Sequence, residues 1–238
     1  MEENGVLYVV ATPIGNLEDI TFRALKVLEA VDLIAAEDTR EAQKLLFHFQ
    51  LKAKGRLVSY YRDNEDRRVK MLLDRMKSGD DVALVSSRGT PGISDPAYLL
   101  VRAAFQEGIK VVPIPGPCAV SAGLSVSGLP TDRFTFFGFL PRKTSKRKRV
   151  LEELKESKMT SIIYESPHRV TKTLADLLNV VGNREMTVCR ELTKKFEEIE
   201  FGTLVGINSK LQIPDSKKPR GEFVIILNGR EKNDKNTG

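Results

Sequence analysis

The chain has 238 residues, of which 41% are hydrophobic, and 38 basic against 32 acidic residues leave a net charge of +6. This length accommodates one large domain or two small ones, and no apolar run reaches the roughly 20 residues of a membrane span. Two cysteines and two histidines are too few for a disulfide framework or a zinc site, so we expect no metal. The acidic first residues do not resemble a secretory signal, which predicts a cytoplasmic protein.

Strand and helix patterns alternate through the first half of the chain. Apolar, β-branched runs predict strands over residues 7–12, 33–36, 57–60, 81–86 and 110–114. Helical patterns between them predict helices over residues 21–29, 39–49, 65–77 and 96–107. This β-α-β-α order favours a mostly parallel sheet with flanking helices. We therefore expect an N-terminal α/β domain over residues 1–114.

The pattern changes after the proline-rich segment 113–117. Helices are predicted over residues 119–126, 145–156 and 167–178, and strands over 133–140, 161–164, 186–191, 197–202 and 222–227. Because strands outnumber helices here, we expect a mixed sheet. The sequence thus predicts a C-terminal mixed α/β domain over residues 115–230 and a disordered tail over 231–238.

Four polar loops follow predicted strands of the first half, over residues 12–16, 37–40, 86–96 and 115–118, and all but 37–40 are rich in proline and glycine. Turn chemistry or a helix N-cap at Asp38 explains each loop taken singly. Parallel strands end on one rim of the sheet, however, so the loops can form one ligand cleft. The chain has neither Gly-x-Gly-x-x-Gly nor Gly-Lys-Ser/Thr, which excludes the two commonest nucleotide-binding loops.

Two further polar clusters follow predicted strands of the second half, over residues 164–169 and 189–195. Ser166 is placed to cap the next helix, with Pro167 at its first position. Capping does not explain the charged side chains in these clusters. These residues are Glu165, His168, Arg169, Arg190 and Lys194. For Glu165, Arg190 and Lys194 the alternative to a functional role is a structural ion-pair network, and for His168 it is a neutral, solvated side chain.

A basic run occupies the start of the predicted helix 145–156. Cations at a helix N-terminus oppose the helix dipole, so stability does not explain the run. We expect it to bind RNA phosphates, and a solvated charged face is the alternative. The run consists of Arg142, Lys143, Lys146, Arg147, Lys148 and Arg149.

Seven motifs stand in one order along the chain, at residues 10–21, 36–40, 89–96, 128–134, 164–169, 190–194 and 220–224. With them, the chain resembles the ribosomal RNA small subunit methyltransferase I family, within the tetrapyrrole methylase-like superfamily, from about residue 7 to about residue 229. The resemblance implies a two-domain tetrapyrrole methylase-like α/β fold that binds S-adenosylmethionine between its domains. It also implies a homodimer.

The resemblance further implies an enzyme that 2′-O-methylates a decoding-centre cytidine (cytidine 1402) of 16S rRNA, within a 30S particle. Its catalytic residues would be Glu165, Lys194 and His168, and Arg169 would join the basic run in binding the substrate RNA. The cofactor-binding residues that it implies are Pro13, Gly15, Arg88, Gly89, Thr90, Pro91, Ile93, Ser94, Asp95, Pro115, Gly116 and Pro117.

Two questions stay open at the level of sequence. Ser87 and Arg88 stand where similar proteins carry Asp-Ala, and we expect the changed charge to affect cofactor affinity. The proton acceptor is Glu165, His168 or Asp38, and we favour Glu165 acting with Lys194. The alternative functions are a same-fold methylase of a small tetrapyrrole-like metabolite and a non-catalytic RNA-binding protein.

Overall fold

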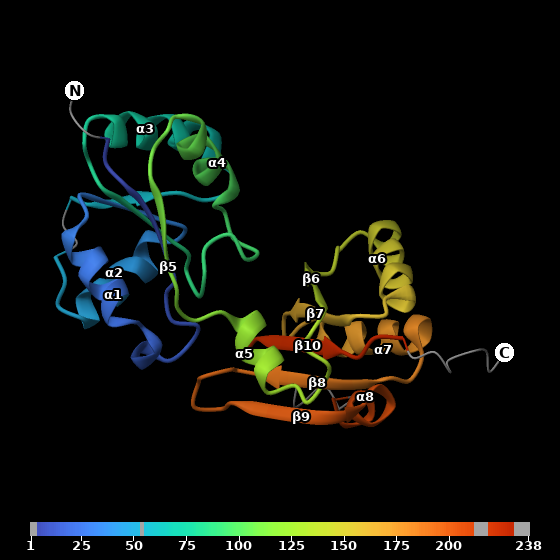
Figure 1. Cartoon of the computed structure of the whole chain (residues 1–238). Helices are drawn as coiled ribbons and strands as arrows, with labels where there is room; N and C mark the ends of the chain where they lie inside the picture. The colour runs from blue at the N-terminus through green and yellow to red at the C-terminus, as the bar shows by residue number, and fades with distance from the viewer. Residues whose placement is uncertain (1–3, 53–54, 212–218, 231–238) are drawn as a thin grey trace. The chain divides into compact units, whose positions relative to one another are not determined.

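The structure is a computed structural model that describes residues 4–52, 55–211 and 219–230. The predicted disordered tail over residues 231–238 therefore lies outside the described residues. The chain divides into two compact units, Met1–Cys118 and Ala119–Gly238 (Figure 1).

The N-terminal unit contains a five-stranded sheet in the order β3-β2-β4-β1-β5, and each neighbouring pair is parallel. The strands are β1 (Leu7–Val10), β2 (Leu33–Ala36), β3 (Leu57–Ser59), β4 (Val82–Val85) and β5 (Val111–Ile114). A short 3₁₀ turn, η1 (Leu17–Asp19), follows β1. The helices are α1 (Phe22–Ala30), α2 (Thr39–His48), α3 (Glu65–Lys77) and α4 (Tyr98–Gln106). The prediction of a parallel α/β sheet is confirmed.

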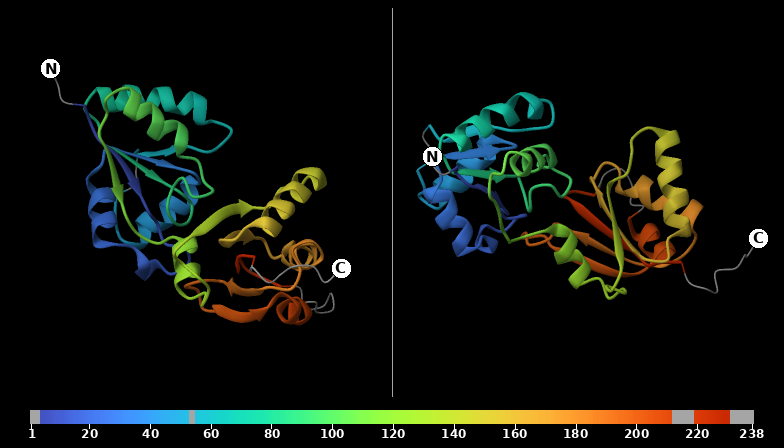
Figure 2. Two further views of the ribbon diagram at one scale, coloured as in Figure 1. Left: turned by 45° about the vertical axis from the view of Figure 1, so that its right-hand side comes forward. Right: turned by 45° about the horizontal axis from the view of Figure 1, so that its top comes forward.

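Helices cover both faces of this sheet. On one face, Leu28 of α1 and Leu46 of α2 pack in a core with Ile34 of β2. On the other face, α3 and α4 lie side by side (Figures 1 and 2), and they share a second core with Ala35, the next residue of β2. Burial on both faces explains why the strands are continuous apolar runs rather than alternating ones.

The C-terminal unit contains a mixed sheet in the order β6-β7-β10-β8-β9. The pair β6–β7 is parallel and the other three pairs are antiparallel, so the predicted mixed sheet is also confirmed. The strands are β6 (Phe134–Phe139), β7 (Thr160–Glu165), β8 (Glu185–Arg190), β9 (Glu198–Thr203) and β10 (Phe223–Leu227). The helices are α5 (Ala119–Ser125), α6 (Thr144–Glu156), α7 (Val170–Val181) and α8 (Leu204–Leu211).

The two faces of the second sheet are covered differently. Residues of α6, α7 and α8 share one core with inward-facing residues of the strands, and α6 and α7 lie side by side (Figure 2). The short helix α5 packs on the strand β10. A Cβ at Gly123 of α5 would lie 3.2 Å from side-chain carbons of Val224 and Ile226, so this close approach needs glycine.

Two local predictions were wrong. Helix α7 begins at Val170, and its N-cap position is Arg169 rather than Ser166. The backbone carbonyl of Ser166 accepts hydrogen bonds from the N–H groups of Arg169 and Val170. Residues 166–169 therefore form a turn. Helix α8 was not predicted at all: the Asn183 side chain accepts a hydrogen bond from Val205 N at 3.0 Å, a long-range cap that local sequence does not reveal.

Candidate active site

The carboxyl ends of all five strands of the N-terminal sheet lie at one rim, because the strands are parallel. Strands β1 and β4 are neighbours at this rim, yet α1 follows β1 onto one face and α4 follows β4 onto the other. A pair of adjacent parallel strands whose following connections leave to opposite faces is a topological switch point, where open α/β sheets bind ligands. The loops after β1 and β4 are therefore the first candidates for a binding site.

These two loops are joined by backbone hydrogen bonds. Thr12 and Gly89 exchange two bonds, at 2.9 and 3.0 Å, in an isolated antiparallel bridge. The Thr12 hydroxyl donates to Ser86 O at 3.2 Å, and the Ser86 hydroxyl lies 3.0 Å from Gly89 O. Because Thr12 and Ser86 are buried, this junction is a fixed part of the unit.

The loop after β5 joins the same cluster. The Thr90 hydroxyl donates to Pro117 O at 3.0 Å. A Cβ at Gly116 would lie 3.0 Å from Ala11 Cβ, and one at Gly89 would lie 3.2 Å from the Ile14 side chain. We call residues 11–16, 86–96 and 115–118 the three-loop cluster, and its close backbone packing depends on glycine.

The predicted cofactor residues all belong to the three-loop cluster, so the structure brings them together. Pro13, Gly89 and Pro91 are buried and shape the loops from within. A ligand at this rim would meet the exposed members, which are Gly15, Arg88, Ile93, Ser94, Pro115 and Gly116.

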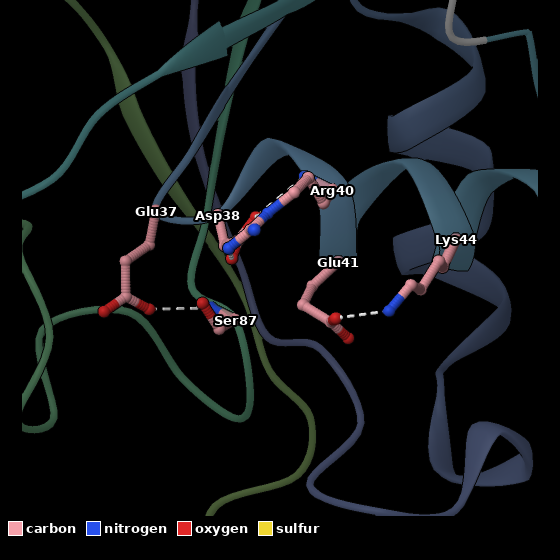
Figure 3. A network of polar contacts seen from close by, with 6 residues as sticks. All are labelled: Glu37, Asp38, Arg40, Glu41, Lys44 and Ser87. Carbon is pink, nitrogen blue, oxygen red and sulfur yellow. Dashed lines mark hydrogen bonds and ion pairs between the residues drawn. The ribbon is translucent and has the colours of Figure 1, made fainter.

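The loop after β2 is tied to this cluster by Glu37. Figure 3 shows its carboxylate directed at Ser87, whose backbone N–H donates to Glu37 Oε2 at 3.0 Å. The next residue, Asp38, is the N-cap of α2 and accepts hydrogen bonds from the backbone and side chain of Arg40 (Figure 3). These bonds hold the pKa of Asp38 well below its ordinary range. The N-cap interpretation of Asp38 is therefore confirmed.

Asp95 is the strongly perturbed carboxyl group of the three-loop cluster. Burial, reinforced by the nearby charge of Glu37, raises the pKa of Asp95 to about 7. A carboxyl group with so high a pKa at a rim of loops is typical of functional sites. Sequence reasoning proposed Asp95 as a cofactor residue and placed the loop 37–40 at the same rim, but it did not name Glu37 as a site residue.

In the C-terminal unit, three polar segments meet at one end of the sheet. Phe223, at the start of β10, pairs with Glu165 at the end of β7 and with Arg190 at the end of β8. The two clusters singled out in the sequence, 164–169 and 189–195, are therefore neighbours, with residues 220–222 between them. Arg190 itself pairs with Glu198 at 2.9 Å.

Glu165 is buried and bonded on both carboxylate oxygens. Oε1 accepts a hydrogen bond from Ser166 N at 2.8 Å, and Oε2 accepts one from the Thr173 hydroxyl at 2.7 Å. Arg169 Nε lies 3.6 Å from Oε1, and the same guanidinium donates to Leu140 O at 2.7 Å. These contacts hold the turn between β7 and α7. His168, in that turn, is exposed.

Lys194 lies in a separate network. Its ammonium group contacts Glu191 Oε1 at 2.7 Å and Glu222 Oε2 at 2.8 Å, and its side chain is 20% exposed. Glu191 and Thr193 both have left-handed backbones, with φ of +51° and +67°, a conformation that costs roughly 1–2 kcal/mol per non-glycine residue. Strained backbone beside a charged cluster is common at functional sites.

The basic run opens α6, and one of its residues differs from the expectation. Arg147 is only 7% exposed and bonds Asp176 of α7 at 2.8 Å. It points into the α6–α7 contact because it lies on the buried face of α6 with Leu151 and Leu154, so we remove it from the expected RNA surface. The exposed cations are Arg142, Lys143, Lys146, Lys148 and Arg149.

The part of the chain that the structure describes has neither a metal-ligand cluster nor a membrane-spanning helix. Within residues 4–52, 55–211 and 219–230, no group of three or more His, Cys, Asp and Glu side chains is arranged to hold a metal ion. In the same residues, each helix is too short or too polar to cross a lipid bilayer.

Comparison with known proteins adds sequence relatives to this geometry. A profile of the family described as Tetrapyrrole (Corrin/Porphyrin) Methylases matches residues 6–207. The chain is 50% identical over 228 residues to a ribosomal RNA small subunit methyltransferase I of Halalkalibacterium halodurans, covering 96% of this chain and 77% of the relative. It is 49% identical to the Vibrio cholerae protein of the same name, covering 94% and 77% of the two chains.

Solved structures show the same fold at low sequence identity. A diphthine synthase has a TM-score of 0.70 at 15% identity, with 94% of this chain and 89% of that one covered. A uroporphyrin-III C-methyltransferase of Thermus thermophilus, solved with S-adenyl homocysteine, has a TM-score of 0.60 at 20% identity, with 94% and 97% covered. The chain therefore belongs to the tetrapyrrole (corrin/porphyrin) methylases and, within them, to the ribosomal RNA small subunit methyltransferase I family.

Proposed function

We propose that this protein is an S-adenosylmethionine-dependent methyltransferase that modifies small-subunit ribosomal RNA. The observation that carries the proposal is the three-loop cluster at the switch point of the N-terminal sheet. It occurs in a chain that is 50% identical, over 96% of its length, to a relative with that name.

The three-loop cluster fits the chemistry of S-adenosylmethionine, which has an adenine ring, ribose hydroxyls and an amino-acid end. Exposed backbone at Gly15 and Gly116 offers hydrogen-bonding groups, and Ser94 and Asp95 offer polar side chains. Ile93 provides exposed apolar surface for a ring. When bound, the cofactor supplies an electrophilic methyl group on a sulfonium centre. The chain then has to orient the acceptor and exclude water.

The acceptor that we propose is a ribose 2′-hydroxyl, which is a weak nucleophile at neutral pH. A positioned proton acceptor accelerates such a transfer by roughly 10²–10⁴-fold. We keep Glu165, Lys194 and His168 as the catalytic group of the proposal. The ammonium of Lys194 favours the ionised form of the ribose hydroxyl. The carboxylate of Glu165 is buried and accepts a hydrogen bond on each oxygen, which fits a role in holding the turn 166–169. Asp38 is less suited, because Arg40 occupies both of its oxygens.

The RNA surface that we propose is the start of α6 together with Arg169. Five exposed cations lie within eight positions there, enough to neutralise several phosphates. The finer parts of the proposal come from the family: the target is cytidine 1402 of 16S rRNA within a 30S particle, and the enzyme is a cytoplasmic homodimer.

Methyl transfer from radiolabelled S-adenosylmethionine tests the proposal directly. Naked 16S rRNA, free 30S subunits and intact ribosomes are offered in parallel with a tetrapyrrole precursor. We expect label in 30S subunits and, after alkaline hydrolysis, one protected linkage at the target cytidine. Label in the tetrapyrrole alone would overturn the substrate, and RNA binding without cofactor binding in calorimetry would overturn the enzyme.

Single-turnover rates separate the catalytic assignments. Glu165→Gln keeps the size of the side chain and removes its charge, so a near-normal rate would exclude a proton-accepting role. Lys194→Met removes the cation, and we expect it to slow the transfer without weakening RNA binding, because Lys194 lies outside the exposed basic run that we propose binds phosphates.

A further inference from the structure

Arg147 belongs to the basic run by sequence but not by its contacts. Its Nε donates to Asp176 Oδ2 at 2.8 Å, and its Nη2 donates to the Thr173 hydroxyl at 3.0 Å. Both partners are on α7, so the guanidinium links the helix with the exposed cations to its neighbour. Its own charge is turned away from solvent.

The direction of the next hydrogen bond is fixed by chemistry. A guanidinium only donates, so the Thr173 oxygen accepts from Arg147. The single hydroxyl proton of Thr173 is then free to be donated to Glu165 Oε2, 2.7 Å away. The result is a directed chain from Arg147 through Thr173 to Glu165, which runs from α6 through α7 to the end of β7.

Arg147, Thr173 and Glu165 are buried, and two partly exposed residues, Asp176 and Arg169, balance the charges of the two ionic ones. Arg147 and Arg169 are cationic, and Glu165 and Asp176 are anionic. Partly buried ion pairs of this kind are weak contributors to stability, because the cost of desolvating the charges offsets much of their attraction. Arg147 Nη1 also finds no acceptor within the described residues, which makes a purely stabilising role a poor explanation.

We propose that Arg147 and Thr173 are positioning residues that hold Glu165 and the turn 166–169 in register with α6. This inference rests on the proposed function, because α6 carries the proposed RNA surface. RNA held by the exposed cations of α6 thereby fixes the position of the Glu165 turn. The basic run divides into outward cations that bind phosphate and one inward cation that transmits their position.

Thr173→Val tests this inference, because valine keeps the shape of threonine and lacks its hydroxyl. Thr173→Ser is the matched variant that keeps the hydroxyl, and Thr171→Val, also on α7, controls for β-branched substitution. We expect Thr173→Val to lower the single-turnover rate roughly 10- to 100-fold. The KM for RNA, the salt dependence of RNA binding and the cofactor affinity should stay within about twofold of wild type.

Hydrogen exchange of residues 166–170 gives a readout that does not depend on activity. We expect a bound 16S rRNA fragment to slow exchange there in wild type and Thr173→Ser, but not in Thr173→Val. If Thr173→Val does not fold, Arg147→Lys replaces it, since an ammonium keeps the charge but not the fork that bonds both partners.

Several results would overturn the positioning role. They are a Thr173→Val rate within threefold of wild type, a Thr173→Ser rate as low as that of Thr173→Val, and RNA protection of α6 that leaves exchange of residues 166–170 unchanged in wild type. Absence of methyl transfer by the wild-type protein on every RNA substrate would instead refute the proposed function, and the exchange experiment would still decide the coupling.

Discussion

Replacing Gly89 with alanine perturbs the point where the loops of the N-terminal unit meet. Gly89 has a φ of +81°, and a Cβ there would lie 3.2 Å from Ile14 Cγ2. The left-handed backbone costs a non-glycine residue roughly 1–2 kcal/mol. Displacing the buried Ile14 side chain adds about 1–2 kcal/mol. We therefore expect the free energy of unfolding to fall by roughly 2–4 kcal/mol.

Gly108→Ala is the matched control for this variant. Gly108 also has a left-handed backbone, with φ of +68°, but a Cβ there would meet nothing within 4 Å. Gly108→Ala should lose only the stability that the left-handed backbone costs a non-glycine residue. Alanine also lowers the conformational entropy of the unfolded chain, and this stabilising effect is the same for both variants. The difference between the two variants isolates the close approach of the loops.

Urea unfolding and calorimetry with S-adenosylmethionine measure the two consequences of Gly89→Ala. We expect it to be about 1–2 kcal/mol less stable than Gly108→Ala and to bind the cofactor roughly tenfold more weakly, since 1.4 kcal/mol corresponds to a factor of ten. Equal unfolding midpoints for the two variants, with wild-type cofactor affinity in both, would refute the argument that close packing at Gly89 shapes the site.

Three further predictions concern charged groups. Changing Lys146, Lys148 and Arg149 to glutamine should reduce the magnitude of the slope of log K against log salt for RNA binding by roughly 2–3. Filter binding at several salt concentrations measures the slope, and an unchanged slope would show that RNA binds to another surface. The pKa of Asp95 is about 7 in the folded protein, against an ordinary 3.8. Between these values Asp95 is ionised in the unfolded chain but still protonated in the folded one, so the free energy of unfolding falls as pH rises from about 4 to 7. Asp95→Asn should lack this loss, and urea unfolding at pH 5 and pH 8 checks whether its advantage over wild type grows with pH. Arg184→Met should lower the free energy of unfolding by about 2–3 kcal/mol, because Arg184 donates hydrogen bonds to the carbonyls of Leu154 and Lys155 near the end of α6. Urea unfolding measures this loss, and a value under about 0.5 kcal/mol would contradict the prediction.

Periodicity and turn chemistry were enough to predict most of the fold. The range predicted for α3, residues 65–77, and the range predicted for β2, residues 33–36, are those observed. Both elements have a local signal: α3 has an amphipathic stripe between polar ends, and β2 is apolar throughout because both faces of its sheet are covered. The start of α7 was misplaced because residues 166–169 form a local turn before the helix begins. The whole of α8 was missed, and Asn183 caps it from another segment.

The order of the motifs was enough to identify the family from sequence alone, because motif order does not depend on how the segments pack. What each charged side chain does was decided only by tertiary structure. Arg147 has the same local sequence environment as Lys146 and Lys148, yet packing of α6 on α7 buries Arg147 and leaves the other two in solvent. The pKa of Asp95 depends on Glu37 from another loop. The helical spacing of Arg147 with Leu151 and Leu154 marks the face that it shares, but its partners come from distant segments. Which residue each charged group pairs with is therefore decided only when those segments pack together.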